Sequence, residues 1–331
     1  MRLTVAAAGA VGLGGSIAAM GGCEDRESKP GGGLGERFEY DIKALAKTDP
    51  ALIGYQQAEV LATDLAGAKA MVVLPDGAIA VAVDRQLKRI GGADDQFDQP
   101  ITCVGVWGDG AMTLGGVNTV ELRVDDRTTA RWNIEGKPHV TSMAIHGDNV
   151  FVADAGNRIV WRFDRAGTLI NRIGDRDASR DIEGFIVPSP LFDCAVDPSG
   201  ELLWVANTGR HRLEAYSFDG EIQRTWGVAS MGIEGFCGCC NPCHFAMLPD
   251  GRFITGEKGL PRVKRYSAAG EFECVVAGCE TFGVQTDALT CNTPASKLGG
   301  PLVAVDAQRR VLALHPAVGE LIAFAEKGAT N

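Results

Sequence analysis

The sequence is poor in positive charge and in charge of any kind. Lys and Arg number 32 against 42 Asp and Glu, so the net charge is -10, and charged residues make up 22% of the chain. A nucleic-acid groove needs clustered Lys and Arg. The basic run of Arg262, Lys264 and Arg265 instead alternates along a predicted strand, which we interpret as a solvated strand face. We therefore predict no nucleic-acid partner.

Two further absences narrow the classes of protein to which this chain could belong. No stretch after residue 20 is apolar and long enough to span a bilayer. The sequence also lacks a G-x-S-x-G motif, so nothing indicates a serine nucleophile of the kind that this motif presents.

The first 23 residues are typical of an export signal. Arg2 gives a positive start, residues 4–20 are apolar apart from Thr4 and Ser16, and small residues precede Cys23. A short apolar run that ends in small residues is a cleaved signal rather than a spanning helix. The Cys at this place resembles a bacterial lipoprotein box, which implies lipidation of Cys23, although Met20 stands where that box has Leu. Ordinary cleavage with an unlipidated Cys23 is the alternative.

These features predict the domain order and the location. Residues 1–22 form the signal peptide, 23–54 a tether and lead-in, 55–326 the folded domain, and 327–331 a tail. The charged and Gly-rich stretch 24–35 cannot bury apolar surface, which is typical of a flexible linker. We expect an exported protein, periplasmic or at the cell surface, anchored to the membrane only through lipid.

One pattern recurs along the chain: an apolar strand, a polar turn, a second apolar strand with a polar tip, and a third strand. A fixed internal period indicates a repeat architecture. The first strand and its turn occur in six copies, at residues 71–77, 103–109, 143–149, 194–200, 245–251 and 303–309.

The second strand and tip are clearest in residues 152–159, 205–213 and 254–263. These residues resemble the NHL repeat, whose core reads V-A-D-x-x-N-x-R-I. Residues 235–242, followed by 245–251 and 257–264, also resemble exported NHL proteins of planctomycete-type bacteria. The resemblance implies an all-β, six-bladed β-propeller. The last copy ends near Phe324, so we predict that the apolar stretch 55–62 supplies its missing outer strand and closes the ring.

Ten cysteines fall into three groups. Cys103 and Cys194 occupy an apolar first-strand column and are predicted to be small buried hydrophobes. Cys23 is at the signal boundary. The remaining seven lie within 55 residues: Cys237, Cys239, Cys240, Cys243, Cys274, Cys279 and Cys291.

Three interpretations of this cluster stay open. Disulfides suit an exported protein and are favoured, with one thiol left over. Zn could bind Cys237, Cys239, Cys240, Cys243 and His244. Cys240-Asn241-Pro242-Cys243-His244 is also a literal C-x-x-C-H, the attachment pattern of c-type haem, but it would have to sit on rigid β-structure.

The ring mouth is the other candidate site. The tip column holds Asp84, Asp154, Asn207, Glu257 and His315. Oxygens that converge from several blades could bind Ca²⁺ or another divalent ion. The favoured alternative is that each carboxylate stabilises its own turn.

A second column, one residue before the core column, faces the axis. It places Asp193 and His244 on adjacent blades, where they could form a structural bridge or an acid and base at the channel. The lead function is a binding or scaffold module that takes a protein or small-molecule ligand on a propeller face. The alternatives are a metal-dependent hydrolase or lyase at the mouth and an electron-transfer protein with haem on Cys240 and Cys243.

Overall fold

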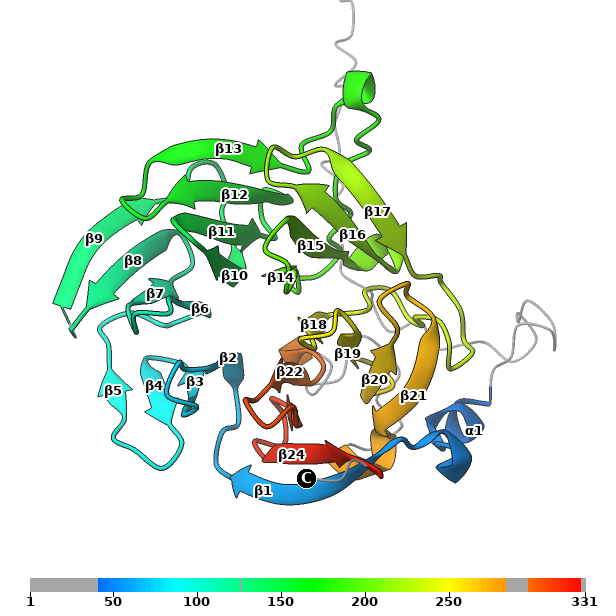
Figure 1. Cartoon of the computed structure of the whole chain (residues 1–331). Coiled ribbons are helices and arrows are strands. Elements are labelled where there is room, and N and C mark those ends of the chain that lie inside the picture. The colour runs from blue at the N-terminus through cyan, green and yellow to red at the C-terminus, as the bar shows by residue number, and fades with distance from the viewer. Residues whose placement is uncertain (1–40, 126, 284–296, 329–331) are drawn as a thin grey trace, which may run out of the picture. The chain divides into compact units, whose positions relative to one another are not determined.

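Six sheets of four antiparallel strands make up the computed structural model, which describes residues 41–125, 127–283 and 297–328. These residues belong to a compact unit that spans Asp41–Asn331. Figure 1 shows the sheets arranged as blades around one axis, each with its first strand at the centre. The fold is a six-bladed β-propeller, which confirms the prediction from the repeats.

The strands follow the chain from the axis outward in each blade. Blades one to three contain β2 (Ala68–Val73), β3 (Ile79–Val83), β4 (Gln86–Arg89) and β5 (Asp95–Gln96), then β6 (Cys103–Val106), β7 (Met112–Gly115), β8 (Thr119–Val124) and β9 (Arg127–Asn133), then β10 (Val140–His146), β11 (Asn149–Asp154), β12 (Ile159–Asp164) and β13 (Leu169–Ile173). Blades four to six contain β14 (Cys194–Val196), β15 (Leu202–Asn207), β16 (Arg212–Ser217) and β17 (Ile222–Trp226), then β18 (His244–Met247), β19 (Phe253–Glu257), β20 (Arg262–Tyr266) and β21 (Phe272–Ala277), then β22 (Leu302–Val305), β23 (Val311–Leu314) and β24 (Leu321–Glu326).

The sixth blade takes its outer strand from the start of the domain. β1 (Tyr55–Ala62) pairs with β24 in antiparallel register, from Tyr55 opposite Glu326 to Ala62 opposite Leu321. The predicted closing strand is therefore confirmed, with the predicted bounds. Closure leaves no open end between the first and the last blade.

Apolar residues fill the space between the blades. Six separate buried clusters each draw side chains from two neighbouring blades, one cluster for each of the six junctions. The predicted core column takes part throughout: Cys103, Cys194 and Phe245, for example, are buried in three different clusters. A blade hides its faces only between neighbours, so the ring is the smallest unit that removes them from water.

The recurring Asp-Gly turns have a local cause. Gly77 and Gly251 both have φ of 85°, in the left-handed region that favours glycine. The preceding aspartates, Asp76 and Asp250, accept the backbone N–H groups of Ala78 and Arg252. Each turn is thus specified by two adjacent residues.

The compact unit begins before the first strand. The short helix α1 (Ile42–Ala46) is capped by Asp41, and its Ala46 packs against Cys237, Leu260 and Cys279. Single turns of 3₁₀ helix lie at Pro50–Leu52, Ala178–Arg180, Thr208–Arg210 and Cys279–Phe282. Within the described residues, no helix has the length and apolar character that crossing a membrane requires.

Candidate functional site

One face of the ring carries all the predicted site residues of the tips and first strands. In each blade, the start of the first strand lies beside the end of the second, as Val140 at the start of β10 pairs with Asp154 at the end of β11. The connection from one blade to the next returns to the same end. We call this end of the ring the mouth face.

Three of the connections between blades on the mouth face are long. They run through residues 174–193, 227–243 and 278–301, and they lead into β14, β18 and β22. Part of the third, 284–296, lies outside the described residues. Binding groups concentrate in loops on a rigid scaffold, so we expect a binding site in this half of the mouth face.

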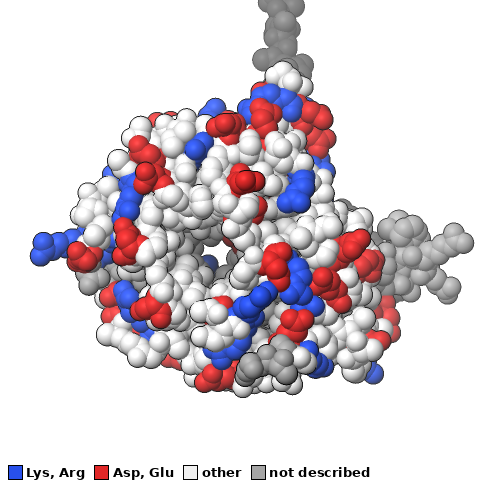
Figure 2. Space-filling model, in the orientation of Figure 1, with Lys and Arg blue, Asp and Glu red and all other residues white. Residues whose placement is uncertain are grey.

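The first strands enclose a channel at the ring centre. Figure 2 shows its opening at the centre of the ring, where most of the rim is formed by residues other than Lys, Arg, Asp and Glu. The cavity has a volume of about 150 Å³, and its lining includes five of the six residues in the axis-facing column: Ala70, Ser142, Asp193, His244 and Leu302.

Asp193 links three blades. Its Oδ1 accepts the Ser142 hydroxyl of blade three at 2.5 Å and its neighbour Cys194 N–H at 2.9 Å. Its Oδ2 accepts the Phe245 N–H of blade five at 3.1 Å and lies 3.6 Å from His244 Nδ1. The carboxylate is held from several directions, so it bridges the first strands as well as facing the channel.

His244 stands beside Asp193, as the column alignment placed it. Its Nδ1 is turned to Asp193 Oδ2, while Nε2 has no hydrogen-bond partner among the described residues. The side chain is 15% exposed and lines the cavity. A carboxylate that orients one ring nitrogen leaves the other available to accept or donate a proton.

Asp154 serves its own turn. The buried carboxylate accepts the N–H groups of His139, Gly156 and Asn157 at 2.8 to 3.1 Å. It also accepts the Asn157 amide at 2.6 Å and the Trp161 indole at 3.0 Å. Its oxygens are occupied, which supports the turn role rather than a metal role.

Asn207 and Glu257 are buried in networks of their own blades. Asn207 accepts the Ile186 N–H and donates to Glu214. Glu257 pairs with Lys264 at 2.6 Å and with Arg262 at 2.9 Å, and all three side chains are at most 3% exposed.

The interpretation of the basic run as a solvated face was therefore wrong for two of its members. Lys264 and Arg262 point inward because Glu257 and backbone carbonyls receive them: Lys264 also donates to the carbonyls of Ile233 and Gly235. Burial lowers the pKa of Lys264, while the Glu257 charge opposes that shift. The alternation of residues along a strand does not reveal that a buried carboxylate lies on the inner side, where it can pair with a buried cation.

The remaining two tip residues differ from each other. His315 is 2% exposed, accepts the Ala317 N–H at Nδ1, and has its pKa lowered to about 4 by burial. Asp84 is exposed and adopts a positive φ of 51°. Among the described residues, no three His, Cys, Asp or Glu side chains come together in a way that could hold a metal ion. The tip column thus does not gather in the way that the alternative interpretation, a site for Ca²⁺ or another divalent ion, would need.

Most of the seven clustered cysteines are buried. They lie in the connection that leads into blade five or in segments next to it. Cys237, Cys240, Cys243, Cys274 and Cys279 are buried, whereas Cys239 is exposed. The described cysteines are all thiols, and Cys23 and Cys291 lie outside the described residues. Burial raises the pKa of the Cys243 and Cys279 thiols to about 12. The predicted disulfides are not present among these residues.

The C-x-x-C-H stretch does not fit haem in this structure. Cys240 and Cys243 have no exposed surface, and the Cys243 thiol donates to the Gly256 carbonyl at 3.2 Å. The backbone of Gly300 passes so close that a Cβ there would lie 2.7 Å from Cys243 Sγ. A porphyrin cannot reach both sulfur atoms through this packing.

Exposed apolar side chains lie on the mouth face, and sequence reasoning missed them. Among the described residues, eight large hydrophobic side chains are exposed. Five of them lie in tips or connections of the mouth face: Val117, Ile186, Val228, Leu298 and Val318. The sequence offered little indication of these residues, because loops have no hydrophobic periodicity from which the exposure of an apolar side chain could be predicted.

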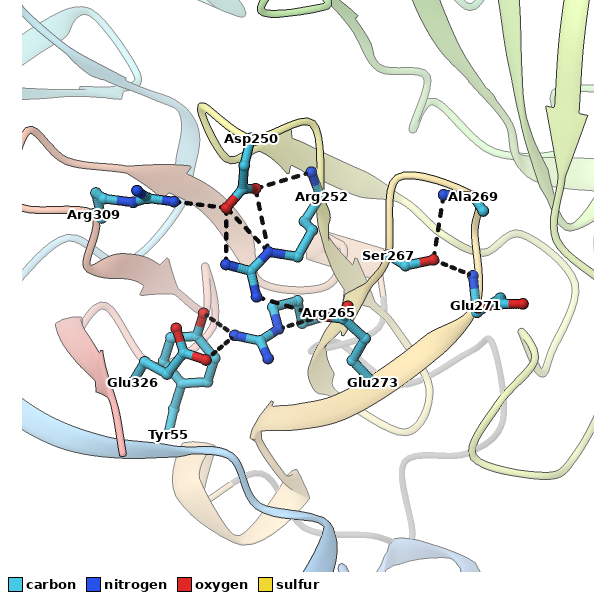
Figure 3. A network of polar contacts seen from close by, with 10 residues as sticks. All are labelled: Tyr55, Asp250, Arg252, Arg265, Ser267, Ala269, Glu271, Glu273, Arg309 and Glu326. Carbon is cyan, nitrogen blue, oxygen red and sulfur yellow. Dashed lines mark hydrogen bonds and ion pairs between the residues drawn. The ribbon is translucent and has the colours of Figure 1, made fainter. Parts of the chain in front are cut away.

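The opposite face carries a polar network instead. Figure 3 shows Asp250 held by Arg252 and Arg309, and Arg265 held between Glu273 and Glu326. The groove beside it has a volume of about 970 Å³. Because each of these arginines is paired with a carboxylate, the network joins blades five and six rather than offering free positive charge.

Comparisons with known proteins bear on the fold. No family model matches the sequence, and no curated protein matches it. A catalytically inactive virginiamycin B lyase from Staphylococcus aureus in complex with quinupristin is similar in structure, with a TM-score of 0.55 and 10% identity over 78% of this chain and 80% of that one. A streptogramin B lyase has a TM-score of 0.53 and 9% identity over 82% and 97%. A protein of unknown function from Bacteroides caccae has a TM-score of 0.50 and 14% identity over 65% and 83%. At this identity the likeness shows that this chain shares the propeller fold of those proteins.

Proposed function

We propose that this chain is a binding propeller that holds a ligand with an apolar body on its mouth face. The observation that carries the proposal is that five of the eight exposed large hydrophobic side chains among the described residues lie in tips or connections of the mouth face. Exposed apolar groups gathered on one face mark ligand or protein sites. His244, which lines the channel cavity, would meet the polar end of such a ligand.

The proposal also assigns the repeats to the NHL type, on the residues at 152–159, 205–213 and 254–263. One structural relative supports a small-molecule ligand, because it was determined with quinupristin bound. A small molecule with an apolar body is the ligand class that the exposed side chains of the mouth face suit best.

Binding can be tested with quinupristin as the probe and isothermal calorimetry as the readout. We expect Val228→Ser and Leu298→Ser each to weaken binding about tenfold, because each removes apolar contact worth about 1.4 kcal/mol. Leu169→Ser and Ile170→Ser, equally exposed on the outer strand β13, are the matched controls and should bind like the wild type. Equal losses in all four variants would reject the mouth face as the site.

A second candidate function is acid–base lyase chemistry at His244. It is favoured by the Asp193–His244 contact and by the open Nε2. Two structural relatives are lyases, and one was studied as a catalytically inactive variant in which alanine replaces a histidine. Turnover of quinupristin that disappears in His244→Gln would establish this function, whereas binding without turnover would leave the binding role alone.

We further propose that the protein is exported and anchored through Cys23. The apolar segment, the small residues and the Cys at 23 support this. Intact mass of protein extracted from membranes should show lipid on Cys23, and Cys23→Ser should release the protein to the soluble fraction. Unlipidated protein in the wild-type membrane fraction would contradict the anchor.

An oxidising location would also allow disulfides. Cys237 and Cys279 share one buried cluster with Leu260, so we propose this pair as a staple between two mouth-face connections. Disulfide mapping of the exported protein tests it directly.

A further inference from the structure

Two adjacent thiols meet at the mouth face. Cys239 Sγ and Cys240 Sγ lie 3.2 Å apart in the connection that leads into β18. Cys239 is an exposed residue, whereas Cys240 has no exposed surface, so the pair runs from the surface of the protein inward. The adjacent cysteines, which the sequence alone marks only as a strained pair, are thus in contact.

The surroundings hold this pair firmly. The Asn241 amide donates to the carbonyls of Cys237 and Lys258 at 2.6 and 2.9 Å, and its oxygen accepts the Lys258 N–H at 2.9 Å. His211 Nε2 contacts the Gly238 carbonyl at 2.6 Å. Both sides of the Cys239–Cys240 step are therefore fixed to neighbouring tips.

A cation accompanies the pair. Lys258 is 8% exposed, and its ammonium lies near the sulfur atoms of Cys240, Cys239 and Cys243. Burial alone would lower the pKa of Lys258, but the interactions with these three cysteines, that with Cys240 first, raise it. Lys258 therefore stays charged beside the cysteine pair.

We propose that Cys239 and Cys240 are a site of reversible oxidation by hydroperoxides, which joins them as a vicinal disulfide. Neither the binding role nor the lyase role depends on this reaction. The ring that closes is strained, and strained disulfides are more easily reduced, so the modification is reversible by small thiols.

The reaction balances in two steps. The Cys239 thiolate attacks one oxygen of the hydroperoxide, the O–O bond breaks, and a sulfenic acid forms while the alcohol or water leaves with the Cys239 proton. The Cys240 thiolate, beside the Lys258 ammonium, then attacks the Cys239 sulfur. The S–O bond breaks, and hydroxide leaves as water with the Cys240 proton. In total the two thiols lose two hydrogens, which the hydroperoxide gains.

The test uses mass spectrometry of the full chain after one equivalent of hydrogen peroxide. The protein is then denatured, labelled with N-ethylmaleimide and cut with trypsin, which places Cys237, Cys239, Cys240 and Cys243 on one peptide, residues 225–252. In protein that is first reduced, so that the proposed Cys237–Cys279 disulfide is open, we expect label on Cys237 and Cys243 only, with a loss of two hydrogens across residues 239 and 240. Dithiothreitol should restore all four labels.

Variants decide which sulfur atoms react. In Cys240→Ser, Cys239 should stop at the sulfenic acid and be trapped by dimedone. Cys239→Ser changes an exposed position and should abolish the reaction even if the buried replacement fails to fold. Cys274→Ser, which removes a buried thiol outside the peptide, should react like the wild type.

Lys258 supplies an independent readout. Lys258→Met should slow disulfide formation about tenfold, while Lys258→Arg retains most of the rate because the positive charge remains. Label retained on both Cys239 and Cys240 while other thiols oxidise would overturn the proposal, as would loss of two hydrogens in Cys240→Ser.

Discussion

At the scale of single residues, equivalent positions of the repeat do different work. Asp154 and Asp84 stand in the same tip column, yet Asp154 is buried with five donors on its carboxylate and Asp84 is exposed. The repeat determines the backbone position of the residue, whereas the surrounding residues determine which groups its side chain contacts.

This difference predicts unequal costs for one substitution. Asp154→Asn turns an acceptor oxygen into a donor that faces other donors, so we expect a loss of about 2 kcal/mol in the free energy of unfolding. Asp84→Asn keeps a residue that tolerates positive φ and should change it by less than about 0.5 kcal/mol. Urea unfolding of both variants measures the difference, and equal losses would contradict the turn role of Asp154.

His315 predicts a pH dependence. Its folded-state pKa is about 4 against an ordinary value of 6.5, because the ring is buried and Nδ1 accepts a backbone N–H. At a pH between these two pKa values, His315 is protonated in the unfolded chain and neutral in the folded chain. The stability that His315 contributes is therefore present above pH 6.5 and is lost as the pH falls toward 4.

The check is the unfolding free energy of His315→Gln and wild type at pH 7 and pH 5. The wild type should lose about 2 kcal/mol more than the variant over this interval. A slope in His315→Gln as steep as in the wild type would show that other groups cause the dependence.

At the scale of elements, two ionic networks of blade five contrast in burial. Glu257, Arg262 and Lys264 tie β19 and β20 to the 227–243 connection and are nearly inaccessible to solvent. The Asp250 network of Figure 3, on the opposite face, is more exposed to solvent, with the Asp250 side chain 37% exposed. The bond from Arg252 lowers the pKa of Asp250 to about 2.

Charge removal should therefore matter in one network and not in the other. Glu257→Gln leaves two buried cations without a counter-charge, and we expect it to lower the free energy of unfolding by about 3 kcal/mol. Asp250→Asn should cost less than about 1 kcal/mol, because water screens the arginines that remain. Thermal and urea unfolding measure both variants, and a small effect of Glu257→Gln would mean that the cluster is hydrated.

At the scale of the whole molecule, stability depends on ring closure. The six clusters between blades form a closed series only because β1 completes the sixth blade. Each blade has two apolar faces, so a ring open at one junction exposes two of them to water.

Proline substitutions in β1 test the closure. Neighbouring residues in a strand send their N–H groups to opposite sides, so one of Gln56→Pro and Gln57→Pro removes a bond to β24 and should lower the unfolding midpoint by several degrees. Gln96→Pro in the two-residue strand β5 closes nothing and should have a smaller effect. If neither β1 proline lowers the midpoint more than Gln96→Pro, β1 does not hold the ring together.

The sequence by itself determined the architecture of this protein. Alternating apolar strands, Asp-Gly turns and six copies of one period are local features, and a repeat that cannot bury its faces alone must stack on its neighbours. The column alignment likewise placed Asp193 beside His244, because equivalent positions of adjacent blades face one axis.

Only the tertiary structure decided which polar groups are occupied, which are buried and which thiols touch. The partners of Asp154, the inward turn of Lys264 and the contact of Cys240 with Lys258 depend on loops from other parts of the chain. Loop residues carry no period that fixes their direction, so their contacts follow from packing in the closed ring rather than from spacing along the chain.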